Sequence, residues 1–236
     1  MTPLVILPTY NERRNIRRLL PRVLSALRGC HVIVVDDSSP DGTGGEVRSM
    51  ARGWRGRIRL VERPRKMGLG GAYVAGFRAA LADRRYGPVI QMDADGSHDP
   101  AVLPRFAAAL RRHDAVVGSR YRGGMRVIDW PWHRLFLSTM ANRYAAFVTG
   151  LPVSDLTGGF NGWNRDALAA IVRAGPRCGG YAFQIEIKHI CARLGYDLAE
   201  IPIVFAGRIE GRSKLSRAVI LEAAWAVWRM RFQHSW

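Results

Sequence analysis

The sequence predicts an α/β protein built on a doubly wound, mostly parallel sheet with helices on both faces. In the first half of the chain, short apolar runs alternate with longer stretches of helical periodicity, as in consecutive β-α-β units. The runs are apolar throughout, which is typical of strands that are covered on both faces. A length of 236 residues suits one large domain, or a domain with a small appendage.

The elements of this first half follow one another in a regular order. Strands are expected at residues 4–7, 31–35, 57–61, 88–92 and 115–120. Helices are expected over residues 12–27, after the turn cluster at 38–43, over 70–82 and over 100–111. Pro8 closes the first strand, and the cluster Ser-Ser-Pro-Asp-Gly-Thr consists of residues that favour turns.

The second half of the chain has a different character. Residues 130–149 and 217–232 combine aromatic and aliphatic residues with arginines, and both stretches predict amphipathic helices. A helix over 181–194 and a strand at 198–205 are expected between them. No segment offers the roughly 20 apolar residues in a row that a membrane-spanning helix needs, so any membrane contact is expected to be peripheral.

The charge of the chain is strongly positive. The formal net charge is +17, and nearly all of the positive charge is arginine because lysine occurs only at positions 66, 188 and 214. Such an excess suits nucleic acid, anionic lipid or a phosphorylated small substrate, and arginine binds phosphate through two parallel N–H groups. A genomic bias towards arginine codons would give the same composition, so charge by itself does not select among these classes.

Polar clusters follow three of the expected strands. They are Pro8-Thr9-Tyr10-Asn11-Glu12, Asp36-Asp37 and Asp93-Ala94-Asp95. In doubly wound sheets the ligand crevice lies beyond the carboxyl ends of the strands, so we expect these distant segments to converge on one edge. Asp37 then lies where such folds bind the ribose or base of a nucleotide, unless it serves as an acceptor within the following turn.

Asp93 and Asp95 predict a metal site. Alternate residues of an extended chain point the same way, so both carboxylates can face one cation. Mg²⁺ and Mn²⁺ prefer oxygen ligands and can bridge carboxylates to phosphates. The alternative interpretation is an aspartate-rich turn that caps the next helix.

Two further groups of residues are candidates for phosphate binding. Arg134 and Ser138 are four residues apart and share one helix face, where they could hold a phosphate monoester. A solvated arginine on an amphipathic helix is the alternative. Arg208, Arg212 and Lys214 lie in a glycine-punctuated loop that could close over a diphosphate, or that simply connects two elements.

Recognisable motifs run through nearly the whole chain. They are LPTYNE at 7–12, VVDDSSPDGT at 34–43, KMGLGGAY at 66–73, MDADGSHDP at 92–100, GSRY at 118–121, DLTGGF at 155–160, GYAFQIE at 180–186 and RIEGRSKL at 208–215. In order and spacing they resemble the dolichol-phosphate mannose synthases and their bacterial polyprenol-phosphate relatives, which are inverting family-two glycosyltransferases with the GT-A fold. The resemblance implies a catalytic domain over residues 1–216, including an acceptor- and membrane-facing helix at 130–149, and a C-terminal amphipathic helix over 217–236.

The resemblance also implies a donor site for a GDP-sugar. The donor-binding residues would be Pro8, Tyr10, Glu12, Val35, Asp37, Asp93, Ala94, Asp95, Arg120, Arg208 and Lys214. Asp95 and Arg120 would act in catalysis. Asp93, Asp95 and Ser97 would hold the metal ion, with Ser97 at a position where many relatives carry glutamine. Arg134 would hold the lipid phosphate together with Ser138.

The implied reaction transfers mannose from GDP-mannose to a polyprenyl or dolichyl phosphate with inversion, and it requires Mg²⁺ or Mn²⁺. The protein would work peripherally at the cytoplasmic face of a membrane, held by its own amphipathic helices or by a separate membrane-anchoring protein. Three alternatives stay open: transfer of glucose or another hexose to the same lipid, a nucleotidyltransferase that uses paired aspartates, and a basic nucleic-acid-binding module. Nucleic acid is not an expected partner, because the last alternative leaves the aspartate clusters unexplained.

Overall fold

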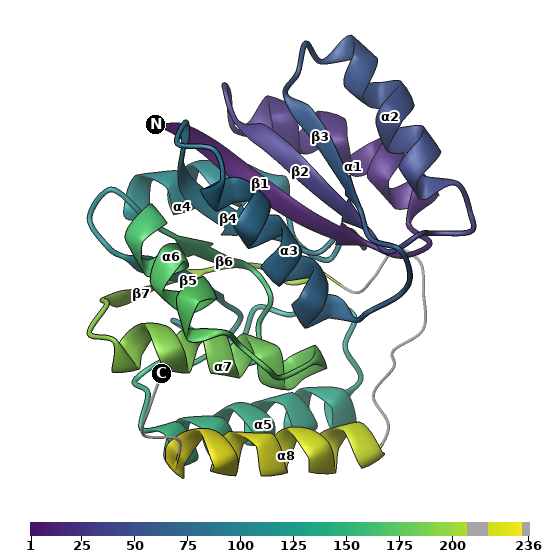
Figure 1. The fold of residues 1–236 in the computed structure, drawn as a ribbon. Helices are drawn as coiled ribbons and strands as arrows, with labels where there is room; N and C mark the ends of the chain where they lie inside the picture. The colour runs from purple at the N-terminus through teal and green to yellow at the C-terminus, as the bar shows by residue number, and fades with distance from the viewer. Residues whose placement is uncertain (207–216, 233–236) are drawn as a thin grey trace.

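The computed structural model describes residues 1–206 and 217–232, which form a seven-stranded sheet flanked by helices (Figure 1). The strands are β1 (Thr2–Thr9), β2 (His31–Asp36), β3 (Ile58–Glu62), β4 (Tyr86–Gln91), β5 (Ala115–Ser119), β6 (Asn161–Trp163) and β7 (Leu198–Pro202). The helices are α1 (Arg13–Ala26), α2 (Thr43–Gly53), α3 (Leu69–Leu81), the short 3-10 helix η1 (Pro100–Val102), α4 (Leu103–Ala109), α5 (Trp132–Thr149), α6 (Arg165–Ala174), α7 (Gly180–Arg193) and α8 (Arg217–Phe232).

The strands are ordered β3-β2-β1-β4-β6-β5-β7, and all neighbouring pairs are parallel except those that involve β6. The predicted doubly wound, mostly parallel sheet is therefore confirmed. β1 lies between β2 and β4, so the direction of winding reverses beside it. In such sheets this switch point opens the ligand crevice at the carboxyl ends of the strands.

The sheet is covered on both faces because alternate side chains of its strands enter two separate cores. Val5 and Leu7 of β1 pack in one apolar cluster with residues of α1, α2 and α4. Leu4 and Ile6, which point the other way, pack in a second cluster with residues of α3, α6 and α7. This double cover explains why the sequence of each strand is apolar throughout instead of alternating with polar residues.

Helices α5 and α8 form a separate layer, in which they lie side by side (Figure 1). A third apolar cluster joins them to α7 through Val148 of α5, Ile185 of α7 and Val227 of α8. The hydroxyl of Tyr144 in α5 also donates a hydrogen bond to the carbonyl oxygen of Ala224 in α8 (3.0 Å). Both amphipathic helices expected from the sequence are thus present, and each buries one side against the rest of the protein.

Two elements were not predicted, and one strand is shorter than expected. The elements that were not predicted are β6, which has only three residues, and α6. The side chain of Asn164 caps the start of α6 by accepting a hydrogen bond from the N–H of Ala167 (2.8 Å), and Gly175, in the left-handed conformation, caps its end. The strand expected at 198–205 ends at Pro202. The N–H of Ile203 still donates to the carbonyl oxygen of Ser119, where β5 itself ends (3.0 Å), and Phe205 then bridges to His98 and Val127 instead.

Candidate functional site

The site lies at the carboxyl ends of β2, β1 and β4. Pro8 and Val35 are paired in register in adjacent strands, and both are buried. Tyr10 follows β1, and the ammonium group of Lys66 lies over its ring, 4.2 Å from the centroid. The loop is held in place by the N–H of Glu12, which donates to Oγ1 of Thr43 (3.0 Å). The structure therefore brings the predicted donor-binding residues Pro8, Tyr10, Glu12 and Val35 to one edge of the sheet.

Asp37 directly follows β2 and is buried at the same edge. Its Oδ2 accepts a hydrogen bond from the N–H of Met67 (3.0 Å), and its Oδ1 lies 3.2 Å from Nε of the buried Arg63. In the turn that follows β2, the carboxylate that accepts hydrogen bonds from Ser39 is that of Asp36, whose Oδ1 accepts from the hydroxyl of Ser39 (2.6 Å). Asp37 therefore connects the end of β2 to the segment that leads into α3, and its contact with a nucleotide remains a prediction.

Asp93 and Asp95 lie after β4, on either side of the buried Ala94. The hydroxyl of Tyr73 in α3 donates to Oδ1 of Asp93 (2.8 Å). The hydroxyl and the N–H of Ser97 both donate to Oδ1 of Asp95, at 2.6 and 3.1 Å. Ser97 thus orients a carboxylate in this structure, and its assignment as a metal ligand remains a prediction.

The residues present fit a divalent cation of the kind that binds phosphates. In the described part of the chain, no group of three or more His, Cys, Asp or Glu side chains forms a closed metal site. A Cβ atom at Gly159 would lie 3.2 Å from Oδ2 and 3.4 Å from Oδ1 of Asp93, so the absence of a side chain at this glycine leaves room beside the carboxylate. Two carboxylates with room for other ligands suit Mg²⁺ or Mn²⁺, which bind through one or two carboxylates plus phosphate oxygens and water.

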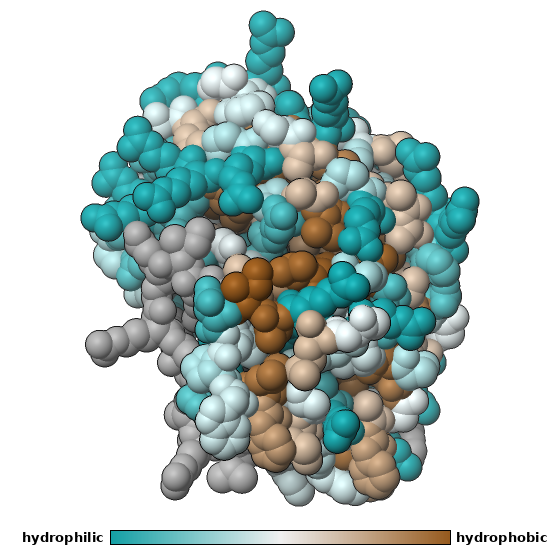
Figure 2. All heavy atoms as spheres, turned by 180° about the vertical axis from the view of Figure 1, so that it is seen from behind, coloured by the Kyte–Doolittle hydropathy of each residue, from teal (hydrophilic) through white to brown (hydrophobic). Residues whose placement is uncertain are grey.

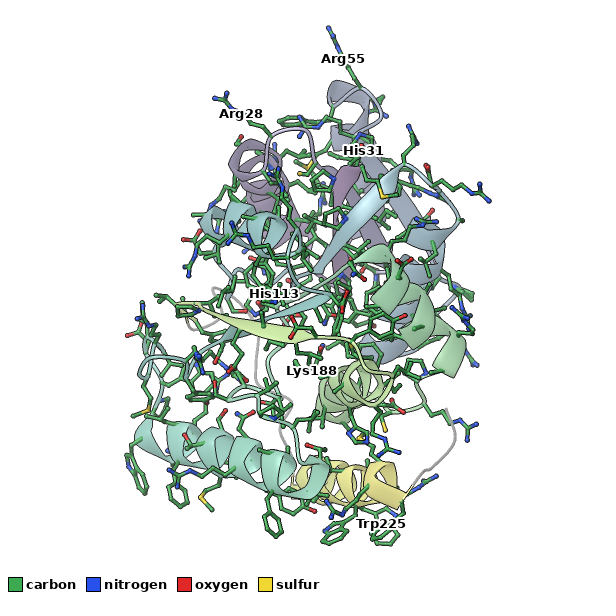
Figure 3. All side chains as sticks on the ribbon, turned by 90° about the vertical axis from the view of Figure 1, so that its left-hand side faces the viewer. Arg28, His31, Arg55, His113, Lys188 and Trp225 are labelled. Atoms are coloured by element: carbon green, nitrogen blue, oxygen red, sulfur yellow. The ribbon has the colours of Figure 1, made fainter. Side chains whose placement is uncertain are left out.

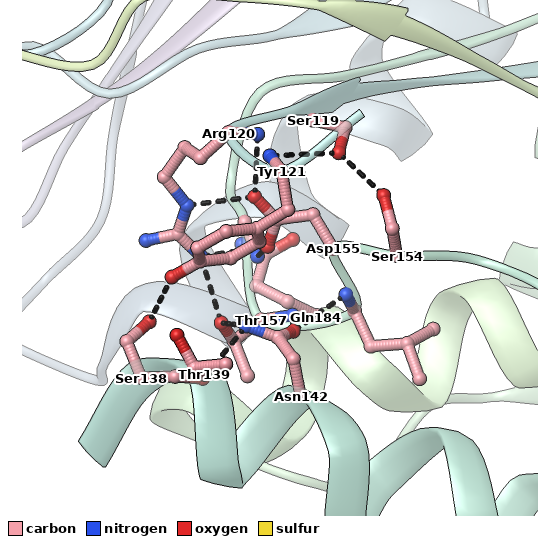
Figure 4. A network of polar contacts seen from close by, with 12 residues as sticks. Ser119, Arg120, Tyr121, Ser138, Thr139, Asn142, Ser154, Asp155, Thr157 and Gln184 are labelled. Carbon is pink, nitrogen blue, oxygen red and sulfur yellow. Dashed lines mark hydrogen bonds and ion pairs between the residues drawn. The ribbon is translucent and has the colours of Figure 1, made fainter. Parts of the chain in front are cut away.

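Arg120, at the end of β5, is buried in an ion pair with Asp155 (Figure 4). Its Nε donates to Oδ2 of Asp155 (2.7 Å), its Nη2 donates to Oδ1 (2.6 Å), and Nη2 also donates to Oγ1 of Thr157 (2.8 Å). Burial alone would raise the pKa of Asp155, but the charge and hydrogen bonds of Arg120 outweigh it and hold this pKa below its ordinary value. The guanidinium group is therefore oriented by the segment 155–157, and its contact with substrate remains a prediction.

Arg134 and Ser138 lie in the first turns of α5, close to the residues that follow β5. The guanidinium carbon of Arg134 lies over the ring of Trp130, 4.1 Å from the centroid. The hydroxyl of Ser138 accepts a hydrogen bond from the hydroxyl of Tyr121 (2.7 Å). Trp130 also lies 5.5 Å from the guanidinium carbon of Arg120, so the proposed acceptor residues lie next to Arg120. Arg208 and Lys214 lie outside the described residues.

Several residues of the site were missed by sequence reasoning. His98 stacks on Phe160 (4.8 Å between centroids) and accepts a hydrogen bond from the N–H of Asp93 through Nδ1 (3.2 Å). Burial lowers its pKa, so the ring is neutral at pH 7 and holds the aspartate backbone. The local signal was its place in the same MDADGSHDP motif.

Lys188 of α7 was also missed, although it is one of only three lysines. It is fully buried, and its Nζ donates to the carbonyl oxygens of Leu156 (2.9 Å) and Gly158 (2.8 Å). Burial lowers its pKa to about 7 against the opposing effect of Asp155. Lys188 thereby supports the same segment that orients Arg120.

The sequence model of one family, Glycosyl transferase family 2, matches residues 4–172. The chain is 42% identical to the polyprenol monophosphomannose synthase of Mycolicibacterium smegmatis, covering 97% of this chain and 87% of that protein. It is 39% identical to the undecaprenyl-phosphate mannosyltransferase of Micrococcus luteus, covering 100% of this chain and 96% of that protein.

The fold is similar to that of solved structures. Glucosyl-3-phosphoglycerate synthase from Mycobacterium tuberculosis, solved with Mn²⁺, uridine diphosphate and phosphoglyceric acid, superposes with a TM-score of 0.70. The two proteins share 20% sequence identity, and the superposition covers 98% of this chain and 78% of that one. The predicted GT-A type of fold is confirmed by this likeness.

Proposed function

Because this chain belongs to glycosyl transferase family 2, we propose that it transfers mannose from GDP-mannose to a polyprenyl phosphate with inversion, using Mg²⁺ or Mn²⁺. That it is a glycosyltransferase follows from the family. The observation that carries the finer proposal is the likeness, over at least 97% of the chain, to two relatives, one named for the synthesis of polyprenol monophosphomannose and the other for mannosyl transfer involving undecaprenyl phosphate.

The donor is proposed to lie across the carboxyl ends of β2, β1 and β4. Tyr10, Glu12 and Asp37 would bind the guanosine, beside Pro8 and Val35 in the strands themselves. Asp93 and Asp95 would hold the cation, which when bound would neutralise charge on the departing diphosphate. Arg208 and Lys214 are proposed to add further positive charge around the donor.

The chemical step is proposed to be a direct displacement. A phosphate oxygen of the acceptor attacks the anomeric carbon from the face opposite the diphosphate, the new glycosidic bond forms, and the bond to GDP breaks. Because a phosphate is already anionic at neutral pH, no strong general base is required. Catalysis would therefore depend on alignment of the two substrates and on stabilisation of the leaving group. Arg134 and Ser138 would orient the acceptor phosphate, next to Arg120.

The acceptor side is proposed to face a membrane surface, because a polyprenyl chain is insoluble in water. Trp132 and Phe147 of α5 are 79% and 80% exposed, and Trp225 of α8 is 67% exposed. Figure 3 shows Trp225 pointing away from the body of the protein, at the end opposite Arg28 and Arg55. Exposed aromatic residues on helices that also carry arginines are typical of helices that lie in a membrane interface.

The distribution of surface hydropathy agrees with this orientation. Figure 2 shows apolar side chains gathered in the middle and lower part of the face seen from behind, towards α5 and α8, whereas hydrophilic side chains dominate its upper part. None of the helices in the described part of the chain has the length and apolar composition that crossing a bilayer requires. Localisation at the cytoplasmic face, and anchoring by a separate membrane protein, are part of the proposal.

The test is to incubate the protein with labelled GDP-mannose, a polyprenyl phosphate and Mg²⁺ or Mn²⁺, and to extract the lipid. Labelled mannosyl lipid is expected, with a β configuration if the donor is α-linked. UDP-glucose in the same assay tests the glucosyl alternative, and glucosyl lipid without mannosyl lipid would overturn the donor assignment. Asp95→Ala should abolish the metal-dependent reaction.

A further inference from the structure

The buried hydroxyl of Tyr73 in α3 is a hydrogen-bond partner of the carboxylate of Asp93. The hydroxyl donates to Oδ1 at 2.8 Å, and the tyrosine is completely buried. A carboxylate oxygen accepts hydrogen bonds, so the tyrosine hydroxyl holds the Asp93 side chain in one orientation.

The ring of Tyr73 is held rigidly by its neighbours. It stacks on Phe183 of α7 with a centroid distance of 6.0 Å and an interplanar angle of 2°, and on Phe77 of α3, also at 6.0 Å. Both phenylalanines are fully buried. The position of the hydroxyl is thus fixed because the Tyr73 ring packs against two other rings, one from α3 and one from α7.

Two glycines allow α3 to pack closely, one against the sheet and the other against the segment that leads into α7. Gly70 and Gly76 lie three residues before and after Tyr73, so all three share one helix face. A Cβ atom at Gly76 would lie 2.6 Å from Cγ2 of Ile6 in β1, and one at Gly70 would lie 2.8 Å from the carbonyl oxygen of Cys178. A larger residue at either position would push α3 away and lengthen the bond between the hydroxyl and Asp93.

We propose that Tyr73 is a positioning residue for the metal site, which fixes one oxygen of Asp93 so that the other oxygen faces the cation. The proposal rests on the metal dependence proposed above. A Cβ atom at Gly159 would lie 3.2 Å from Oδ2 and 3.4 Å from Oδ1 of Asp93, so this glycine leaves room beside the carboxylate for a cation to approach. Removing a hydrogen-bond partner of a metal ligand typically weakens metal binding by about 10- to 100-fold.

The test compares Tyr73→Phe with Tyr86→Phe. Tyr86 is also buried, and its hydroxyl is hydrogen-bonded to Nδ1 of His31 (3.2 Å), away from the aspartates, so this control also removes one buried hydroxyl. Mn²⁺ binding is measured by electron paramagnetic resonance at a fixed concentration of GDP, with the protein-free mixture as reference. We expect the dissociation constant for Mn²⁺ to rise by about tenfold or more in Tyr73→Phe, and to stay within about twofold of wild type in the control.

Further variants separate the possible outcomes. Asp95→Asn should remove specific Mn²⁺ binding; if it binds Mn²⁺ as the wild type does, the metal site itself is wrong and the proposal fails with it. If Asp95→Asn loses Mn²⁺ while Tyr73→Phe retains wild-type affinity, the role of Tyr73 is overturned and the proposed function stands. Phe183→Leu keeps every polar atom but loosens the ring, so a smaller rise in the dissociation constant is expected, and unchanged affinity counts against the proposal even if Tyr73→Phe fails to fold.

Discussion

Replacing Asp155 with asparagine tests the buried ion pair that orients Arg120. Oδ2 of Asp155 accepts from the backbone N–H (3.0 Å) and Nε (2.7 Å) of Arg120, and Oδ1 accepts from Nη2 (2.6 Å) and from the N–H of Gly158 (3.0 Å). Asparagine has the same shape but no charge, and its NH₂ group would face N–H donors of Arg120 or Gly158 instead of accepting hydrogen bonds from them. Removing one partner of a buried pair costs about 3–5 kcal/mol because the other charge stays uncompensated. We expect the free energy of unfolding to fall by about this amount.

The assay is urea denaturation followed by tryptophan fluorescence, repeated over a range of pH. The folded pKa of Asp155 is lowered, so its contribution to stability is present above the unfolded pKa of about 3.9 and is lost as the pH falls through the folded pKa. The difference in stability between wild type and Asp155→Asn should therefore be largest near neutral pH and should shrink in acid.

Glu62→Gln provides the matched control for charge removal. Glu62 pairs with Arg48 at the surface, where both side chains are at least half exposed, and such pairs contribute about 0–1 kcal/mol. A loss of less than about 1 kcal/mol in Asp155→Asn, or a difference from wild type that persists undiminished at acid pH, would refute the reasoning. The turnover rate of the folded variant should fall as well, because Arg120 loses its orientation.

Three other outcomes are expected. Burial lowers the pKa of Lys188 to about 7, so below that pH the folded protein bears the whole free-energy cost of burying the charged ammonium group. As the pH rises from about 7 to about 10.4, the folded protein has lost this proton while the unfolded chain still binds it. The stability of wild type relative to Lys188→Met, measured by urea denaturation, should therefore increase over this interval. Arg134→Ala should raise KM for the polyprenyl phosphate about tenfold or more while KM for GDP-mannose stays unchanged, and equal changes in both would contradict a role confined to the acceptor. Replacing Phe147 and Trp225 together with serine should weaken co-sedimentation with anionic vesicles about tenfold or more, whereas Leu194→Ser, an exposed apolar residue outside α5 and α8, should not.

Much of the fold could be predicted because its signals are local. The apolar runs that became β1, β2 and β4 end at polar residues, and parallel pairing alone is enough to bring those ends together. β6 escaped prediction because its sequence Asn-Gly-Trp is too short to show a period, and its place between β4 and β5 depends on contacts far along the chain. α6 has caps at both ends, Asn164 and Gly175, which a closer reading of the sequence could have used.

Sequence motifs predicted individual residues of the site, but not the contacts between residues from different motifs. The spacing of Asp93 and Asp95 predicts a metal site. The contact of Tyr73 with Asp93, in contrast, depends on the close packing of α3 on β1. The pairing of Arg120 with Asp155 joins positions 35 residues apart, and neither residue carries a local sign of the other. A buried lysine such as Lys188 runs against the expectation that lysine is exposed, so composition gives no means of finding it.

One side chain links the proposed membrane-facing layer to the proposed site of chemistry. Asn142 of α5 accepts hydrogen bonds at Oδ1 from the N–H groups of Leu156 (2.8 Å) and Thr157 (3.0 Å), and its Nδ2 donates to Oγ1 of Thr157 (3.2 Å). The neighbouring Asp155 holds Arg120. α5 therefore cannot shift relative to Arg120 without breaking buried hydrogen bonds. Direct displacement depends on alignment to within a fraction of an ångström. The proposed reaction therefore requires a rigid connection between the helix that would hold the lipid phosphate and the strand end that would face the donor.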